Sequence, residues 1–127
     1  TAVITSVTLR IKMQGTVGTN AFTTHGGLLV DIRKPAFGLP ALQITYFQAV
    51  ATKPAVATFG MSPLSNWSSA LLNNFGKANI NRSGATQFRL RFTKDDNNNH
   101  IADFIKFFSG NALAASQPQL IIQYYVP

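Results

Sequence analysis

The sequence contains no cysteine and no glutamate, and its only acidic side chains are four aspartates. The absence of cysteine excludes a disulfide framework, a thiolate zinc site and a thiol nucleophile. Glycoside hydrolysis by a carboxylate pair would have to use two aspartates, and only Asp31 and Asp103 lie on different predicted strands. No motif places a nucleophile beside His25 or His100. The sequence therefore predicts a protein that is not an enzyme.

Long apolar runs and charged residues are also scarce. No run approaches the roughly 20 apolar residues needed to cross a bilayer, so no membrane insertion is expected. Only 12% of the residues are charged, and eleven lysines and arginines give a formal net charge of +7. That charge favours anionic partners, among them acidic polysaccharide, nucleic acid and an anionic cell surface. Solubility alone is an equally good reason for it.

Alternation of apolar and polar residues is the main structural signal. In residues 28–33, for example, Leu28, Val30 and Ile32 would face inward and Asp31 outward. The segments expected to form strands, six or seven in number, are residues 3–13, 28–33, 55–60, 66–73, 86–92, 101–108 and 119–126. Short strands between turn-rich loops, with little helix, indicate an all-β fold, an antiparallel β-sandwich of jelly-roll type. The sandwich would span residues 1–127 as a single domain.

The first predicted strand begins at once, with no preceding turn or tail. If it forms the edge of a sheet, residues 1–13 expose backbone N–H and C=O groups that need a partner strand. Two sources of that strand are open, a segment upstream of residue 1 and another copy of the chain. Self-association by strand exchange is therefore one expected property.

The chain resembles a group of bacterial extracellular modules most closely in three stretches. These are TQFRLRF (residues 86–92), DFIKFFSGNA (103–112) and PQLIIQYYVP (118–127). The modules are DNRLRE-type, carbohydrate-binding-module-like jelly rolls, commonly found at the C-terminal end of larger secreted proteins. The resemblance covers most of the chain and is loosest over residues 36–85. It implies a jelly-roll sandwich, a secreted or cell-surface location, a non-catalytic role, and one or more family strands missing before residue 1.

Tyrosine and tryptophan are suited to stacking on sugar rings, because each combines an apolar ring with a polar edge. Trp67, Tyr46 and Tyr125 are therefore the candidate carbohydrate-binding residues. The ten phenylalanines fall mostly at inward strand positions and are expected in the core. A core position is also open for Trp67, since the only tryptophan of a small β-domain is commonly buried.

Two pairs of basic residues occupy outward positions of predicted strands, Arg10 with Lys12 and Arg89 with Arg91. If these strands are neighbours, the four cations form one anion-binding stripe for phosphates or uronates. No aromatic residues interleave with the arginines, so the base stacking of single-strand binders is not expected and nucleic acid is the weaker partner. A solvated outer sheet face is the plainer interpretation.

Three of the four aspartates lie in the polar segment 93–110, where they alternate with asparagines. The candidate metal ligands are Asp95, Asn97, Asn99 and Asp103. Such oxygens suit Ca²⁺, but His100 and Lys106 stand where an EF-hand needs glycine and glutamate, so an EF-hand is excluded. A looser structural calcium site and a solvated turn both stay open, since Asp and Asn favour turns by bonding their own backbone.

Three functions are consistent with these features. The first is a non-catalytic extracellular module that attaches a larger protein to polysaccharide or to the cell surface. The second is a structural subunit of an extracellular assembly or filament, completed by strand exchange. The third and weaker one is a basic accessory domain that binds nucleic acid.

Overall fold

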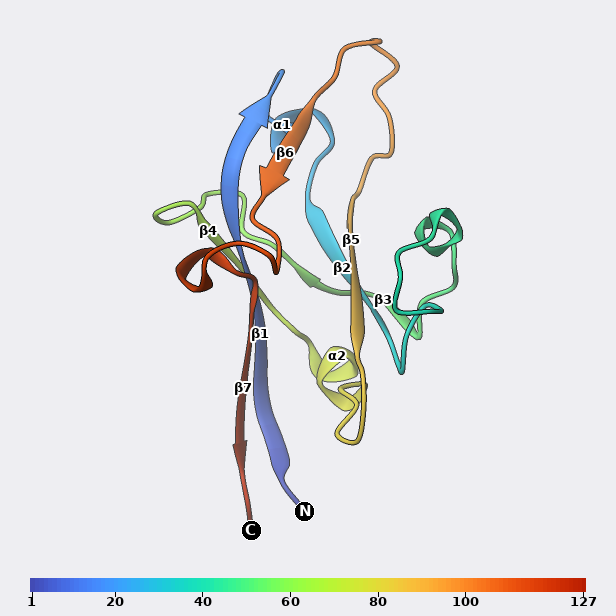
Figure 1. Ribbon diagram of the computed structural model, residues 1–127, viewed down its shortest axis with the longest axis vertical. Helices are drawn as coiled ribbons and strands as arrows, with labels where there is room; N and C mark the ends of the chain where they lie inside the picture. Colours follow the sequence, from blue (N-terminus) through green and yellow to red (C-terminus); the bar gives the residue numbers. More distant parts are fainter.

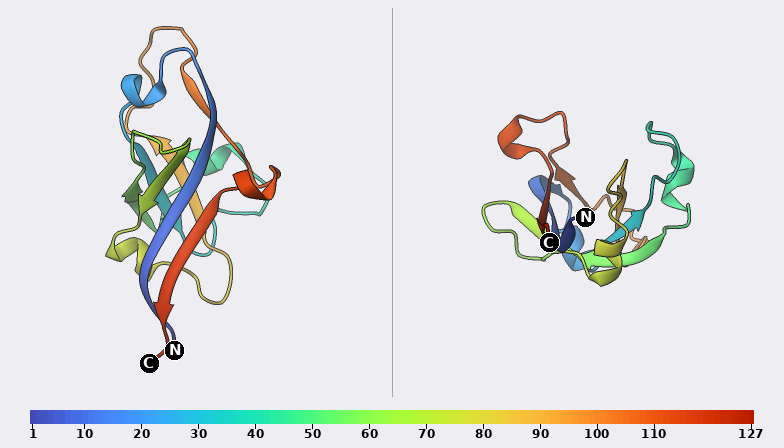
Figure 2. Two further views of the ribbon diagram at one scale, coloured as in Figure 1. Left: turned by 90° about the vertical axis from the view of Figure 1, so that its left-hand side faces the viewer. Right: turned by 90° about the horizontal axis from the view of Figure 1, so that it is seen from below.

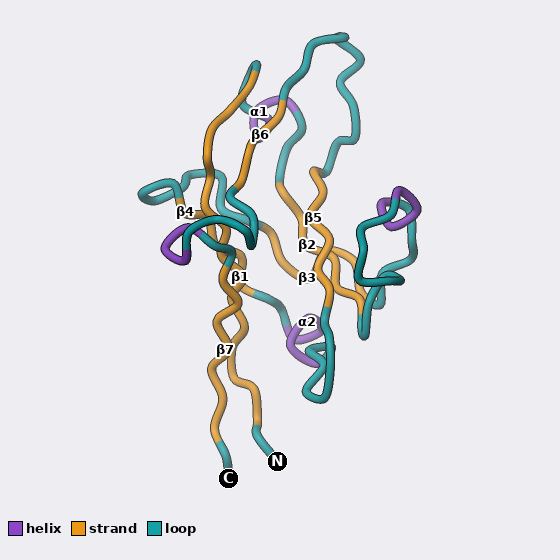
Figure 3. The backbone as a smooth tube through the Cα atoms, viewed as in Figure 1, coloured by secondary structure: helices purple, strands orange, loops and turns teal.

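The computed structural model describes residues 1–127 as two antiparallel β-sheets with a few short helical segments (Figures 1 and 3). The strands are β1 (Val3–Val17), β2 (Leu28–Arg33), β3 (Lys53–Thr58), β4 (Trp67–Leu71), β5 (Gln87–Phe92), β6 (Phe104–Phe107) and β7 (Gln119–Tyr125). The helical segments are α1 (Ala21–Thr24), η1 (Ile44–Phe47), α2 (Asn74–Ala78) and η2 (Ala114–Ser116). No helix is long and apolar enough to span a membrane. The predicted all-β sandwich is confirmed.

Strand β1 is the centre of the larger sheet. One edge of β1 pairs with β4 over Thr8–Lys12, and the other edge pairs with β7 over residues 3–10 and with β6 over residues 13–17. The prediction that residues 1–13 form an exposed edge is therefore wrong. The strand has partners on both sides because β7, from the far end of the chain, lies along it, and no local sequence pattern reveals that pairing.

The smaller sheet has the order β3-β2-β5, with β2 in the centre. The two sheets are joined on one side, where Gly60 N–H donates to the Ser69 carbonyl and Asn73 N–H donates to the Val56 carbonyl. Seen along its length, the molecule has a U-shaped outline that is closed at β3 and β4 and open between β5 and the β6–β7 side (Figure 2).

The hydrophobic core lies near the closed side of this U. It comprises Val7, Leu9, Ile11, Phe22, Leu28, Val30, Ile32, Val56, Ala57, Phe59, Ala70, Leu72 and Ile80. These side chains come mainly from β1 to β4, and the predicted inward positions of residues 28–33 are confirmed. The strands at the closed side therefore hold most of the buried apolar surface.

The open side leaves core-type residues partly uncovered. Leu120 and Ile122 of β7 pair with Leu9 and Val7 of β1, so they face the same way as those buried side chains. They are nevertheless 42% and 36% exposed. The inward residues of β5 are likewise only partly buried. The sandwich thus has one covered side and one apolar side that faces solvent.

Candidate functional site

Where β1 meets β4, the outer face of the four-stranded sheet carries one tryptophan and two cations. Alternation along β1 places Arg10 and Lys12 on this face, and Trp67 of β4 lies directly opposite Lys12. The guanidinium carbon of Arg10 lies 4.7 Å from the centre of the Trp67 ring, and Lys12 Nζ lies 6.0 Å from it. Both contacts are cation–π interactions, which hold the charged groups beside the ring.

Two neutral side chains from the η2 and β7 side of β1 hydrogen-bond the same cations. Arg10 Nη1 donates to Gln119 Oε1 at 3.0 Å, and Lys12 Nζ donates to Ser116 Oγ at 3.2 Å. We call these five residues, Arg10, Lys12, Trp67, Ser116 and Gln119, the Trp67 patch. Neither cation of the patch has a carboxylate partner, because both ion pairs of the protein involve a different residue, Asp31. The patch therefore keeps uncompensated positive charge and free N–H donors, the chemistry of an anion site.

The three candidate aromatic residues do not form one platform. Tyr125 lies on the same outer face as Gln119 but six residues further along β7, about 20 Å away. Tyr46 belongs to η1, beside the other sheet, where its hydroxyl donates to the Leu39 carbonyl at 3.1 Å. Trp67 is half-buried, and Arg10 covers one face of its ring. A ligand would thus meet the charged groups of the patch more readily than the face of the Trp67 ring.

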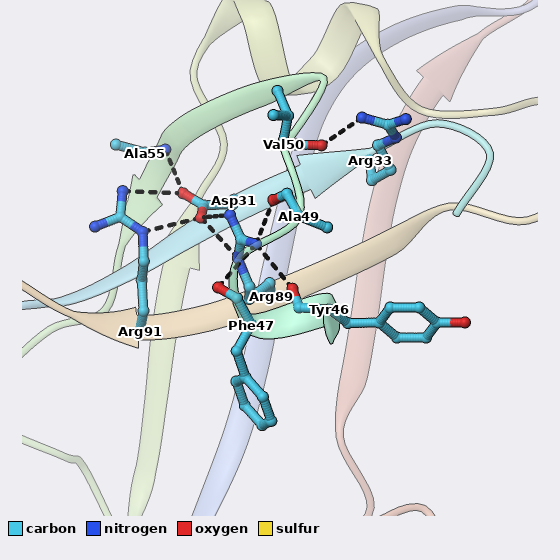
Figure 4. Close-up of polar contacts among 9 residues, drawn as sticks. All are labelled: Asp31, Arg33, Tyr46, Phe47, Ala49, Val50, Ala55, Arg89 and Arg91. Atoms are coloured by element: carbon cyan, nitrogen blue, oxygen red, sulfur yellow. Dashed lines mark hydrogen bonds and ion pairs between the residues drawn. The ribbon is translucent and has the colours of Figure 1, made fainter. Parts of the chain in front are cut away.

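The other predicted basic pair, Arg89 and Arg91, lies on β5 of the smaller sheet and is committed to Asp31 of β2 (Figure 4). Arg89 Nη2 lies 2.7 Å and Arg91 Nε 2.9 Å from Asp31 Oδ2. The predicted stripe of four cations is wrong, because β1 and β5 belong to different sheets. Of the predicted anion-binding residues, the structure brings only Arg10 and Lys12 together with Trp67.

The Asp31 carboxylate is fully buried beneath the segment that follows β2. Its Oδ1 accepts the backbone N–H of Ala55 at 2.8 Å. Arg89 extends the same network, since its Nη1 donates to the carbonyls of Tyr46 and Ala49 at 2.9 and 2.6 Å (Figure 4). These bonds fasten the chain between β2 and β3 onto the outer face of the smaller sheet. The cluster of Asp31, Arg89 and Arg91 is therefore structural, and we call it the Asp31 cluster.

The electrostatics of Asp31 fit this role. Burial disfavours its charged form and by itself would raise the pKa. Hydrogen bonds from Arg91, from the Ala55 N–H and from Arg89 more than offset burial, so that the pKa of Asp31 lies below its usual value of 3.8. Asp31 is thus an anion at neutral pH with both oxygens occupied. It is not free to act with Asp103 as a catalytic pair.

The polar segment 93–103 folds as a series of turns. Asn97 Oδ1 and Asn99 Oδ1 accept the backbone N–H groups of Asn99 and Ile101, while their amide nitrogens face Asp103 Oδ2 at 3.3 and 3.5 Å. Asp103 Oδ1 also accepts the N–H of Thr19 at 2.7 Å, which ties the segment to the end of β1. Asp95 has no hydrogen bond to the other three candidate ligands. Three of the four candidate ligands thus gather at Asp103, and the structural calcium site stays a prediction.

Ser116 and Gln119 of the Trp67 patch were not among the predicted site residues. They reach Arg10 and Lys12 only through the pairing of β7 with β1, and nothing near them in sequence marks that pairing. The Asp31 cluster did have a signal, since opposite charges occupy outward positions of two predicted strands. That signal becomes decisive only once β2 and β5 are known to be neighbours.

No family model matches the chain, and no curated protein or solved structure matches it. The resemblance to DNRLRE-type modules therefore stays a prediction.

Proposed function

We propose that the protein is a non-catalytic module that attaches a larger protein to acidic polysaccharide, for example at a cell surface, through the Trp67 patch. The observation that carries this proposal is the state of Arg10 and Lys12. Both cations are held by specific contacts, and neither is neutralised by a carboxylate. The N–H donors of Arg10 and Lys12 are therefore ordered before a ligand binds, and a ligand carboxylate or sulfate would not have to pay the entropy of ordering them.

The geometry of the patch suits a row of anionic groups. Alternate residues of a strand lie roughly 7 Å apart on one face, so Arg10 and Lys12 can contact charges on neighbouring sugar rings. A guanidinium that stacks on Trp67 presents its N–H edge away from the ring, and that edge matches a carboxylate in a bidentate manner. The polar residues Gln119 and Gln123 continue along the same face. A polymer on this face would therefore meet the two cations at the patch and neutral hydrogen-bonding side chains next to them.

The test compares polygalacturonate with its fully methyl-esterified form, because the two polymers share a backbone and differ in charge. Isothermal titration calorimetry at 0.15 M NaCl should detect binding to polygalacturonate only. Arg10→Ala should weaken this binding at least about tenfold, since one charge-assisted hydrogen bond is worth roughly 1.5–3 kcal/mol. Lys94→Ala is the matched control: it removes the same charge from an exposed lysine outside the patch and should change affinity by less than about twofold.

Equal binding of both polymers, or equal losses for Arg10→Ala and Lys94→Ala, would show that the patch is not the site. Duplex DNA of equal charge density provides the comparison with the nucleic-acid hypothesis. Tighter binding of DNA than of polygalacturonate, lost in Arg10→Ala, would assign the patch to nucleic acid instead.

A further inference from the structure

The outer edge of β7 has no partner. Strand β7 pairs with β1 along one edge only, and none of the remaining backbone hydrogen bonds of the protein involves its residues. In Figure 1 the lower part of β7 lies at the side of the molecule, next to β1, and the η2 segment lies beside its upper end. A row of backbone N–H and C=O groups is therefore available for another strand.

The composition of β7 favours such pairing. Its seven residues, QLIIQYY, include no charge, proline or glycine, and the register shift of the β1–β7 pair lies in β1. Apolar side chains stand on both faces: Leu120, Ile122 and Tyr124 inward, Ile121 outward, all between 36% and 62% exposed. Edge strands that stay single usually carry a lysine, a proline or a bulge, and β7 has none of them.

The total surface points to a partner of substantial size. The accessible area is 8038 Å², whereas a compact monomer of this mass exposes about 6,600 Å². The excess of about 1,400 Å² exceeds the roughly 800 Å² that each side contributes to a standard protein–protein interface. The open side of the U-shaped sandwich, with the inward faces of β5 and β7, contributes to this exposed surface, as do loop residues such as Leu42 and Leu113.

The edge of β5 is a poorer site for a second strand. A groove of about 270 Å³ lies there, lined by residues of both faces of β5, Phe88 and Leu90 as well as Gln87 and Arg89, and by Tyr46 and Phe47 of η1. The segment that contains η1 thus flanks this edge. The edge of β7 has no such neighbour. The outer edge of β6 is also unpaired, but β6 has only four residues and carries Lys106.

We infer that a second copy of the chain covers this side of the molecule, with the β7 strands of the two copies pairing antiparallel across a two-fold axis. Antiparallel pairing of identical edges is self-complementary, because each copy supplies the same donors, acceptors and apolar side chains that it needs. The pairing uses the β7 edges of both copies, so the assembly ends at a dimer. The two four-stranded sheets would become one continuous sheet, and the two open sides would meet.

The positive charge of each copy opposes dimerisation, so the strength of the dimer should depend on salt concentration. Each copy carries a formal net charge of +7, so the copies repel one another at low ionic strength. The Debye length falls from about 30 Å at 0.01 M salt to about 8 Å at 0.15 M. Dimerisation driven by apolar contact and backbone pairing should therefore strengthen as salt is added.

The test is the mass of the protein in solution, measured by sedimentation equilibrium from 5 to 200 µM chain at about 0.02, 0.15 and 0.5 M NaCl. The expected result is a dimer whose dissociation constant decreases with salt. Ile121→Lys places a charge on the edge strand and should weaken the dimer at least tenfold. Leu71→Lys is the matched control, because Leu71 and Ile121 flank Thr8 on the same outer face but only Ile121 is on β7.

A wild-type protein that stays monomeric at every concentration and salt would overturn the inference and leave the open side to a strand of another polypeptide. Equal dimerisation of both lysine variants would also overturn it, since the interface would then lie elsewhere. If circular dichroism shows that Ile121→Lys is unfolded, Gln123→Lys replaces it, because Gln123 is exposed on the same face of β7. Failure of polysaccharide binding would leave these results unaffected.

Discussion

Asp31 receives hydrogen bonds from two separate parts of the chain, from Arg89 and Arg91 of β5 and from the backbone N–H of Ala55 in β3. Its side chain is fully buried, whereas the Arg89 and Arg91 side chains are 15% and 41% exposed. Removing the single anion would leave two cations without a partner, one of them largely buried. Breaking a buried pair from one side is costly for this reason.

We expect Asp31→Asn to lower the free energy of unfolding at pH 7 by about 2–3 kcal/mol, below the cost of a fully buried pair because Arg91 is partly solvated. The pKa of Asp31 is lowered in the folded protein. Its contribution is therefore fully present above the unfolded-state pKa near 3.8 and is lost as the pH falls towards the lower folded-state pKa. The two proteins should thus converge in stability as the pH falls below about 4.

Urea unfolding followed by circular dichroism at pH 7, 5, 4, 3 and 2 measures this difference. Asp96→Asn is the control, because it removes the same charge from an exposed residue in the 93–103 turns. A gap between wild type and Asp31→Asn that does not narrow in acid would mean that the Asp31 charge does not stabilise the fold.

For single residues, the sequence predicts which face of the sheet a side chain lies on better than it predicts how deeply that side chain is buried. The alternation of residues 28–33 placed Asp31 opposite the core side chains, and that is correct. Its complete burial was not predictable in the same way, because the cover comes from the segment after β2, which has no periodic pattern. The same limit applies to Trp67, whose neighbours Ser116 and Gln119 come from the other end of the chain.

At the element scale, alternation located the strands but not their partners. The segments predicted at residues 28–33, 86–92 and 119–126 match β2, β5 and β7 within one residue. The segment 101–108 shrinks to the four residues of β6, because Asp103 and its neighbours are engaged in turns. Which strand lies beside which depends on long-range pairing. This is why β1 was expected at an edge and lies in the centre.

Strand β3 contains an irregularity that can be tested by itself. The pairing of β2 with β3 shifts register between Val30 and Ile32, and Ala55 there has φ = 50°, in the left-handed region. Ala55→Gly should stabilise the protein by roughly 0.5 kcal/mol, because relief of about 1–2 kcal/mol of strain exceeds the extra entropy of glycine in the unfolded chain. Ala57→Gly, at a buried position of the same strand, should destabilise it by about 1.5 kcal/mol.

Thermal unfolding of wild type and the two glycine variants shows directly whether each substitution raises or lowers the stability. Destabilisation by Ala55→Gly equal to that by Ala57→Gly would mean that Ala55 is not strained in solution. The Asp31 cluster would then hold an ordinary strand rather than a bulged one.

At the scale of the whole molecule, the proposed dimer and the proposed binding site share one sheet. The Trp67 patch lies on the outer face formed by β4, β1 and β7, and the free edge belongs to β7. Pairing two copies through β7 would place two patches on one continuous outer face. Each patch is cationic, so the dimer would present two anion sites to a single long polymer. Once one patch has bound the polymer, binding at the second patch is intramolecular, which raises the overall affinity.

The consequence is a dependence of affinity on polymer length. Wild-type protein should bind long polygalacturonate at least about tenfold more tightly than it binds trigalacturonate, because only the long chain reaches both patches. Ile121→Lys should lose this advantage, although its added cation alone would favour an anionic polymer. Leu71→Lys adds the same charge and should keep the advantage. Titration calorimetry with both ligands separates the cases: if Ile121→Lys retains the full preference for long polymer, the two patches do not act together.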